Sequence, residues 1–505
     1  MIEETVRKIL QARVYDVAEQ TPLTHAPLLS LRLNNSVYIK REDLQPIFSF
    51  KLRGAYNKMV TLDAAARDRG VIAASAGNHA QGVALSASRL GISALIVMPK
   101  TTPAIKVNAV QQLGAQTISH GDSYDEACDY ALVLADKKNL TFIHPYDDID
   151  VIAGQGTIAL EILSQKSGTI DAVFVPVGGG GLIAGIASYI KFVRPEIKII
   201  GVEPDDANSM AQALESGQRV ILEQVGLFAD GVAVRQAGKE TFRIAQQLVD
   251  EMICVSTDEI CAAIKDIFDE TRSITEPAGA LAVAGLKQYV ERHNIKNQCL
   301  IAINSGANTN FDRLRYVAER AELGEHKEAL LAVTIPEKPG SFLEFCQILG
   351  EHSVTEFNYR YFHTADARVF VGVSISTDSN ERQILLQQFN QAGLSAIDMT
   401  ENELAKEHIR YMVGGHMAGS QQERVFSIEF PERPGALLDF LTALNGRWNI
   451  SLFHYRNHGA AFGRVLIGMQ LEKSESADFT ACLNQLGYRF TEETENLAYT
   501  LFAGS

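Results

Sequence analysis

The chain has 505 residues, a hydrophobic content of 46%, a charged content of 21% and a formal net charge of -15 at pH 7. This length exceeds one hydrophobic core, and a prior of roughly 150 residues per domain predicts about three units. The composition excludes a wholly disordered protein, and the negative charge, with no basic run in the sequence, argues against nucleic-acid binding.

The amino-terminal segment and the cysteines indicate a cytoplasmic protein. The opening "MIEETVRKILQARVYD" carries acids and has the pattern of a short amphipathic helix, unlike a secretory signal or a transit peptide. The apolar run "LIAGIASYIKFV" is interrupted by Lys191 and is too short to span a bilayer. The six cysteines form no C-x-x-C pair, which is typical of free thiols in a reducing compartment. We expect neither a membrane segment nor a metal site.

From about residue 37 to residue 305, apolar runs of strand length alternate with helical patterns. Continuous Val/Ile/Ala runs suit strands buried on both faces, and hence a largely parallel sheet covered by helices. In such sheets ligands bind beyond the carboxyl ends of the strands, so chemistry is expected in the turns that follow them. The strand candidates are "SVYIK", "GVIAAS", "SALIVMP", "AVFVPV", "IKIIGVE" and "CLIAIN", and the helix candidates include "HAQGVALSASRL" and "SYDEACDYALVLADKK".

The segment "SFKLRGA", Ser49 to Ala55, places Lys51 between a bulky aromatic residue and a small, glycine-containing helix start. A lysine taken alone is usually a solvated surface residue that needs no further explanation. With an ordinary pKa of about 10.4, its amine is a poor nucleophile at pH 7 unless the pKa is shifted or the amine is stored as a Schiff base. The turns elsewhere in the chain decide whether Lys51 has such a role.

The turn "SAGNHAQG", Ser75 to Gly82, lies between an apolar strand and a helix. It offers a hydroxyl, backbone donors, the Asn78 amide and the His79 imidazole near a helix N-terminus that can hold a carboxylate. Capping of the helix by Ser75 or Asn78 explains the same residues without any ligand.

The turn "GGGGL", Gly178 to Leu182, follows the strand "AVFVPV" and precedes another helix. Glycines allow successive N–H groups to point into one concavity at a helix start, which predicts a phosphate site. A tight crossover between strand and helix explains this turn equally well.

The same window also fits a dinucleotide site. Gly179, Gly181 and Ala184 satisfy G-x-G-x-x-A, and Glu203 ends the next strand, where a ribose-binding acid is expected. An NAD-dependent dehydrogenase is therefore an alternative on this window, but it assigns no task to Lys51.

A third polar turn, "NSGANTN" from Asn304, ends the strand "CLIAIN", and Ser305 there is either a helix cap or a hydroxyl aimed at a ring nitrogen. One cofactor would use all three turns and Lys51, because it has a phosphate, an aldehyde that needs an amine, a phenolic oxygen and a pyridine nitrogen. That cofactor is pyridoxal phosphate.

After about residue 323 the chain carries two copies of one module. "TIPEKPGSFLEFCQIL" from Thr334 aligns with "EFPERPGALLDFLTAL" from Glu429, and the pairs "SVTEFNYR" with "NISLFHYR" and "RVFVGV" with "RVLIGM" keep the same offset of 95 or 96. Three blocks in one register predict a duplicated module with the order strand, helix, strand, strand, helix.

The motifs "SFKLRGA", "SAGNHAQG", "GGGGL" and "SGAN", in this order, resemble the fold type II pyridoxal-phosphate enzymes of the tryptophan-synthase-β type. The repeats resemble ACT-type amino-acid-binding modules and narrow the resemblance to the biosynthetic threonine dehydratase family. The resemblance covers essentially the whole chain. It implies an α/β catalytic domain with a mainly parallel sheet over residues 1–322, followed by two α+β ACT-like regulatory modules, 323–412 and 413–505. It also implies a homo-oligomer, which in this family is a tetramer.

The resemblance also implies roles for individual residues. Lys51 would bind the cofactor's aldehyde as a Schiff base and, once displaced by the substrate's amine, remove the Cα proton as general base. Asn78 would bond the phenolic oxygen, and Ser305 the ring nitrogen. The phosphate would lie on Gly178, Gly179, Gly180, Gly181 and Leu182, and the substrate carboxylate on Ser75, Ala76, Gly77, Asn78 and His79.

The implied reaction is the deamination of L-threonine, with L-serine as a second substrate, by elimination of water to 2-oxobutanoate and ammonia, the committed step of isoleucine biosynthesis. A neutral hydroxyl beside the ring nitrogen makes a milder electron sink than a carboxylate and favours loss of the β-hydroxyl. The sequence does not identify the acid that protonates this leaving group.

The family further implies isoleucine as feedback inhibitor and valine as its antagonist. Candidate effector contacts are Phe342 and Tyr359 in the first module and Leu437, Leu441 and Tyr455 in the second. Core packing of the modules explains the same pattern.

Other enzymes and one non-enzyme compete with this hypothesis. Serine dehydratase, serine racemase and threonine synthase share the chemistry, but the repeats argue against the first two, and the third needs a pocket for a substrate phosphate. A catalytically silent amino-acid sensor has no chemical need for Lys51 and Ser305. Preference for threonine over serine depends on room for one methyl group, worth about 1–3 kcal/mol, and the sequence does not locate that pocket.

Overall fold

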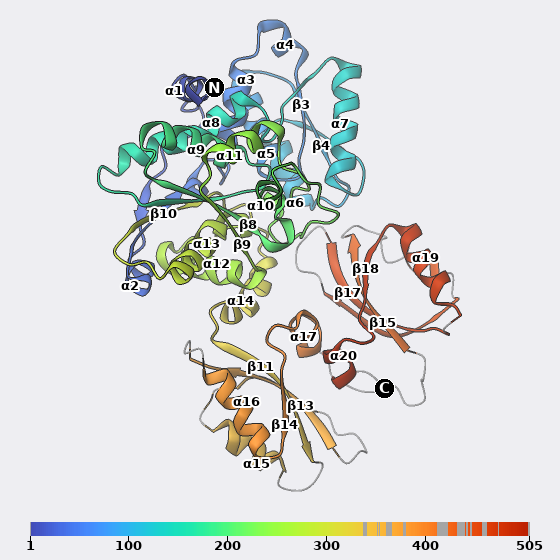
Figure 1. Ribbon diagram of the computed structural model, residues 1–505. Coiled ribbons are helices and arrows are strands. Elements are labelled where there is room, and N and C mark those ends of the chain that lie inside the picture. Colours follow the sequence, from blue (N-terminus) through green and yellow to red (C-terminus); the bar gives the residue numbers. More distant parts are fainter. Residues whose placement is uncertain are drawn as a thin grey trace. The chain divides into compact units, whose positions relative to one another are not determined.

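The computed structural model describes residues 2–336, 341–350, 352, 354–359, 366–376, 380–411, 423–431, 440, 443–444, 447–456, 462–472 and 474–502. The chain forms two compact units, Met1–Val317 and Ala318–Ser505 (Figure 1). Helix α14 (Arg313–Gly324) contains both this division and the predicted boundary at 322/323. The predicted boundary at 412/413 lies outside the described residues, so both domain limits stay predictions. Within the described ranges, no helix is long and apolar enough to cross a membrane.

The first unit is built on two sheets, and the prediction of mainly parallel strands is confirmed. The six-stranded sheet has the order β1-β2-β10-β7-β8-β9 and is parallel except for β1, while the four-stranded sheet β5-β4-β3-β6 is parallel throughout. The division into two sheets is not visible in the sequence. The strands are β1 (Leu23–His25), β2 (Ser36–Arg41), β3 (Val71–Ala74), β4 (Ala94–Met98), β5 (Gln116–Ser119), β6 (Thr141–Phe142), β7 (Ala172–Pro176), β8 (Lys198–Pro204), β9 (Glu251–Val255) and β10 (Cys299–Asn304).

Both sheets are covered on both faces. Along β7, Phe174 belongs to one apolar core and Val175 to the core on the other face, and along β3 the neighbours Ile72 and Ala73 divide in the same way. This two-sided burial is why the strands read as continuous apolar runs. The covering helices are α1 (Ile2–Leu10), α2 (Pro27–Leu33), α3 (Lys51–Val60), α4 (Ala64–Arg69), α5 (Asn78–Leu90), α6 (Ala104–Gln112), α7 (Tyr124–Lys138), α8 (Ile149–Gln165), α9 (Gly181–Val193), α10 (Ser209–Ser216), α11 (Lys239–Leu248), α12 (Thr257–Thr271) and α13 (Pro277–His293), with the short 3-10 turns η1 (Glu42–Leu44), η2 (Asp205–Ala207) and η3 (Asp230–Val232) between them.

The second unit contains two antiparallel four-stranded sheets of matching order, β12-β13-β11-β14 and β16-β17-β15-β18. Each sheet has one edge strand that the sequence did not predict, β14 (Ser395–Asp398) or β18 (Arg489–Glu492). These strands are short and partly exposed, so their apolar pattern in the sequence is weak. The remaining elements are β11 (Glu328–Pro336), β12 (Val354–Tyr359), β13 (Asp366–Ser374), β15 (Glu423–Pro431), β16 (Asn449–Arg456), β17 (Phe462–Gln470), α15 (Ser341–Leu349), α16 (Glu381–Gln391), α17 (Glu403–Glu407), η4 (Ile409–Tyr411), α19 (Ser476–Leu486) and α20 (Leu497–Phe502).

An apolar seam joins the two sheets of the second unit. Leu330 and Phe370 of the first sheet belong to one buried cluster with Val425 and Leu466 of the second. The two modules therefore share a core, and a change of packing in one of them can reach the other.

Candidate functional site

Lys51 is the first residue of α3, and its side chain is partly buried. Its Nζ donates a hydrogen bond to Pro145 O at 3.1 Å and lies 5.4 Å from the centre of the Phe50 ring. Burial lowers the pKa of this amine to about 8, although the carboxylate of Glu276 acts in the opposite direction. Half of such an amine is neutral at pH 8, which suits a nucleophile or a base.

The turn 75–79 joins the carboxyl end of β3 to α5. Gly77 N donates to Ser75 Oγ at 3.2 Å, and no side chain caps α5, so the capping explanation of Ser75 and Asn78 is wrong. His79 is buried, and its Nε2 lies 2.8 Å from Ile143 O, which requires the proton on that nitrogen. Burial, with the nearby charge of Lys51, lowers the pKa of His79 to about 3, so the ring is neutral at pH 7.

The Asn78 amide ties this turn to two distant parts of the chain. Its Nδ2 donates to Glu276 Oε1 at 2.7 Å, and its Oδ1 accepts from Asn308 Nδ2 at 2.7 Å. Glu276 is not recognisable as a site residue in the sequence, because an acid directly before a proline at a helix start has the pattern of an ordinary cap. Burial raises the pKa of Glu276 to about 7.

The glycine turn follows β7 and leads into α9, where Leu182 is buried. Gly180 has a φ of 92°, a conformation that glycine adopts without strain. A Cβ on Gly179 would lie 2.3 Å from the Tyr146 ring, and one on Gly181 would lie 3.0 Å from the Tyr146 backbone. The chain segment that accepts the Lys51 hydrogen bond at Pro145 therefore also packs against this turn.

Ser305 follows β10 and is 3% exposed. Its Oγ donates to Ala278 O at 3.3 Å. Its carbonyl accepts from the N–H of Phe50, the residue directly before Lys51, at 3.2 Å. The structure thus brings together Lys51, Asn78 and Ser305 from three separate segments, with the glycine turn next to the segment that contacts Lys51. The individual roles implied by the resemblance stay predictions.

The predicted effector residues are not placed by the structure. Leu437 and Leu441 lie outside the described residues, as do the side chains of Phe342, Tyr359 and Tyr455.

Glu203, the acid on which the dehydrogenase alternative depends, is engaged elsewhere. Its two carboxylate oxygens accept hydrogen bonds from Met210 N at 2.9 Å and Ala211 N at 2.8 Å, at the start of α10. Burial raises the pKa of Glu203 to about 8. A carboxyl group whose oxygens already accept hydrogen bonds from a helix start is not available to a ribose, which argues against a dinucleotide site.

The residues around Lys51 fit pyridoxal phosphate. The glycine turn presents N–H groups at the start of α9 where side chains would collide, which suits a phosphate. The amine of Lys51 has the lowered pKa that an aldehyde requires. On the segments that carry Lys51 and Ser305, Ser49 Oγ and Asn304 Nδ2 are buried and form no hydrogen bond within the described part of the chain.

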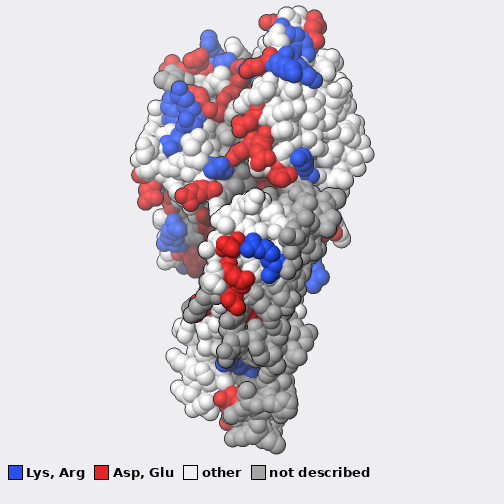
Figure 2. All heavy atoms as spheres, turned by 90° about the vertical axis from the view of Figure 1, so that its right-hand side faces the viewer, with Lys and Arg blue, Asp and Glu red and all other residues white. Residues whose placement is uncertain are grey.

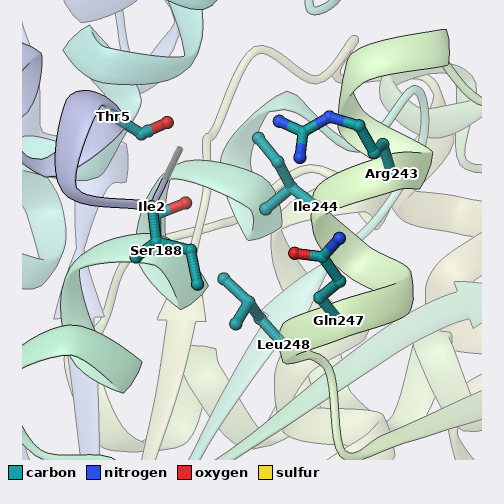
Figure 3. A pocket seen from close by; sticks show the side chains of 7 residues that line it. All are labelled: Ile2, Thr5, Ser188, Arg243, Ile244, Gln247 and Leu248. Carbon is teal, nitrogen blue, oxygen red and sulfur yellow. The ribbon is translucent and has the colours of Figure 1, made fainter.

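Two other surface features lack the properties of a binding site. A shallow depression without enclosed room for a water molecule is lined by Ile2, Thr5, Ser188, Arg243, Ile244, Gln247 and Leu248 (Figure 3), none of which belongs to the predicted site. On the face shown in Figure 2, the Lys and Arg side chains of the described residues are interspersed with Asp and Glu. Such a mixture differs from the basic stripe that nucleic-acid binding needs.

Known proteins match both parts of the chain. Residues 14–306 match the family model of a pyridoxal-phosphate dependent enzyme, and residues 319–409 and 414–503 match the C-terminal regulatory domain of threonine dehydratase. The chain is 56% identical over 500 residues to the L-threonine dehydratase biosynthetic IlvA of Burkholderia multivorans, with 98% of each chain covered. It is 52% identical over 487 residues to the chloroplastic biosynthetic threonine dehydratase of Arabidopsis thaliana, covering 96% of this chain and 82% of that one.

A solved structure shows the same likeness. The processed form of threonine deaminase isoform 2 from Solanum lycopersicum is 53% identical and has a TM-score of 0.62, covering 63% of this chain and 93% of that chain.

Proposed function

The chain belongs to the family of biosynthetic threonine dehydratases, which are pyridoxal-phosphate-dependent lyases, and we propose on this premise that it converts L-threonine to 2-oxobutanoate and ammonia. L-Serine is proposed as a second substrate. The observation that carries the proposal is that the segments of Lys51, Asn78 and Ser305 lie together. Phe50 N, next to Lys51, donates to Ser305 O, and Glu276, which accepts from Asn78 Nδ2, acts on the charge of the desolvated Lys51 amine.

Pyridoxal phosphate, when bound, withdraws electrons from the Cα of the amino acid attached to it. Lys51 would hold the cofactor's aldehyde carbon and, after the substrate's amine has displaced it, would accept the Cα proton at Nζ. A pKa near 8 suits this task because the amine can be neutral before the transfer and charged after it.

The other predicted residues would bind and orient. The N–H groups of Gly178 to Gly181, with Leu182, would hold the phosphate at the start of α9. Asn78 would donate to the phenolic oxygen, and Ser305 would bond the ring nitrogen. The turn from Ser75 to His79 would hold the substrate carboxylate through its hydroxyl and backbone N–H groups. His79 would take part as a neutral ring, because its pKa is about 3.

The function is tested by recording the absorbance of the purified protein before and after adding L-threonine, with 2-oxobutanoate assayed in the same cuvette. We expect a visible cofactor band that changes as the ketoacid appears. If no band forms even after pyridoxal phosphate is added, the proposal fails and the NAD-dependent and sensor alternatives are tested next.

We also propose that isoleucine inhibits the enzyme, that valine opposes this inhibition, and that the enzyme is a cytoplasmic homotetramer. The support is the twofold match to the C-terminal regulatory domain of threonine dehydratase and the apolar seam that couples the two modules. An effector must bind two conformations unequally, with a coupling of about 1–3 kcal/mol. Threonine titrations with and without each amino acid measure this coupling, and light scattering measures the oligomeric state.

Gly179→Ala is expected to weaken cofactor binding. The added methyl group would lie 2.3 Å from the Tyr146 ring, so the ring or the turn must move. Displaced N–H groups lose charge-assisted hydrogen bonds to the phosphate, each worth about 1.5–3 kcal/mol, which corresponds to a dissociation constant for pyridoxal phosphate raised by roughly one to two orders of magnitude. Gly168→Ala is the control, because a Cβ there meets only the flexible Lys166 Nζ at 3.6 Å. Equal affinities of the two variants would contradict the phosphate role of the turn.

Capture of pyridoxal phosphate by the cofactor-free protein is expected to follow the ionisation of Lys51. Only the neutral amine attacks an aldehyde, so the rate should rise as the pH passes through about 8 and level off above it. Stopped-flow absorbance between pH 6 and pH 10 measures this rate. A rate that still rises steeply near pH 10, as for an ordinary lysine, would show that the amine is not desolvated.

A further inference from the structure

Glu276 is a buried carboxylate whose backbone is fixed on both sides. Its N–H donates to Gly306 O at 3.1 Å, and its carbonyl accepts from Ala280 N at 3.2 Å in the first turn of α13. The residue is 4% exposed, and its side chain does not cap its own helix. The carboxylate is therefore held in place for a contact outside α13.

That contact belongs to a chain of hydrogen bonds with a fixed direction. Asn308 Nδ2 donates to Ile47 O at 2.7 Å, and since a carbonyl can only accept, this end of the Asn308 amide must be its nitrogen. The same nitrogen donates to Asn78 Oδ1 at 2.7 Å, so the Asn78 nitrogen faces Glu276 and donates to Oε1 at 2.7 Å. The Ile47 carbonyl fixes this orientation of the Asn78 amide whether or not the Glu276 carboxyl is ionised.

An amide nitrogen carries two hydrogens, and Glu276 accepts one of them. We propose that Glu276 is a positioning residue, which holds the Asn78 amide so that its second N–H stays available to the phenolic oxygen of pyridoxal phosphate. This inference rests on the role proposed above for Asn78. It adds a residue that acts through Asn78 and need not touch the cofactor itself.

The charges around Glu276 support a functional purpose. The nearby cations Lys106 and Arg313 both form ion pairs with Asp230, at 2.7 Å and 3.3 Å. Among the described residues, the hydrogen-bond partner of the Glu276 carboxyl group is the Asn78 amide. A buried carboxylate without a paired cation destabilises the fold, and such groups are found preferentially at functional sites. Glu276 also raises the pKa of Lys51, so a direct electrostatic action on that amine is the competing explanation.

A double-mutant cycle separates the two explanations. Glu276→Ala is expected to raise the dissociation constant of pyridoxal phosphate roughly tenfold and to shift the absorption band of the bound cofactor. Added to Asn78→Ala, the same substitution should change neither quantity further, because its effect passes through the missing amide. Additive effects, or no effect of Glu276→Ala on the band, would overturn the inference.

Two conservative variants keep the test decisive if Glu276→Ala fails to fold. Glu276→Gln keeps an acceptor oxygen and removes the charge, so cofactor affinity and absorption band should stay close to those of the wild type. Glu276→Asp keeps the charge but is too short to keep the 2.7 Å contact, so it should resemble Asn78→Ala. If Glu276→Asp kept the wild-type affinity and Glu276→Gln resembled Asn78→Ala, the electrostatic action of the Glu276 charge on Lys51 would be the cause.

Glu291→Ala, an exposed carboxylate at the far end of α13, is the matched control. A wild-type protein that binds no cofactor or leaves threonine unchanged would defeat the proposed function. A working wild type with an unaltered Glu276→Ala variant would defeat only the present inference.

Discussion

Replacement of Lys51 by alanine is expected to abolish threonine turnover and to leave both units folded. The substitution removes the amine that would hold the cofactor and the base that would accept the Cα proton, and the base alone is worth about 10²- to 10⁴-fold in rate. The fold should survive, because alanine is a good helix former and the Lys51 amine donates its hydrogen bond to a backbone carbonyl, that of Pro145, and not to a carboxylate. The measurement is 2-oxobutanoate formation, with far-UV circular dichroism as the test of folding.

Lys58→Ala is the matched control, because Lys58 lies on the same helix and forms an ion pair with Asp148 at 2.8 Å, away from the predicted site residues. Borohydride reduction of the wild type, followed by peptide mapping, should place the cofactor on Lys51 and not on Lys58. Turnover that persists in Lys51→Ala, or a label on another lysine, would remove Lys51 from its proposed role.

Much of this site can be predicted from the sequence, because each of these residues lies within a short, recognisable segment. Asn78, Gly180 and Ser305 each lie in a short segment where an apolar strand gives way to a helix or a polar turn, and Lys51 lies at a helix start. These changes of pattern can be recognised without a structure. The amphipathic helix predicted at the amino terminus is likewise present as α1.

Residues that meet across long separations could not be found in this way. Asn78 contacts Glu276 and Asn308 at separations of 198 and 230 residues, and no spacing rule connects such positions. The same limit hides the two sheets, because Ser36 of β2 pairs with Cys299 of β10. Glu203 shows the converse: its spacing fits a ribose-binding acid, but spacing does not reveal that its oxygens hold the start of α10.

Arg53→Ala is expected to cause a large loss of stability, because it breaks a buried ion network. Arg53 lies on α3, two residues after Lys51. Arg53 contacts Glu42 at 2.8 Å and Glu161 at 2.6 Å, and Lys40 contacts Glu161 at 2.6 Å. All four side chains are at most 1% exposed. Removing one member of a buried network costs about 3–5 kcal/mol, because the remaining charges stay buried without compensation.

Arg53→Lys should recover only part of this stability. The guanidinium donates to both carboxylates from separate nitrogens, and an ammonium cannot reproduce that planar geometry. Arg292→Ala is the control, since its ion pair with Glu251 is half-exposed and such pairs contribute about 0–1 kcal/mol.

Urea unfolding followed by circular dichroism measures these differences. Trp448, the one tryptophan of the chain, lies in the second unit, so its fluorescence serves as an internal reference for that unit. Loss of stability confined to the Trp448 transition would contradict the assignment of the network to the first unit.

The pH dependence gives a second test of the same network. Burial opposes the ionisation of Glu42, but Arg53 and Lys40 outweigh it and hold the pKa of Glu42 below its usual value. A lowered carboxyl pKa means that the stabilisation is complete above about pH 4.5 and is lost as the pH falls through the lowered pKa. The difference in unfolding free energy between the wild type and Arg53→Ala should therefore narrow in acid. A difference that stays constant down to pH 3 would show that Arg53 stabilises α3 through the packing of its side chain and not through its charge.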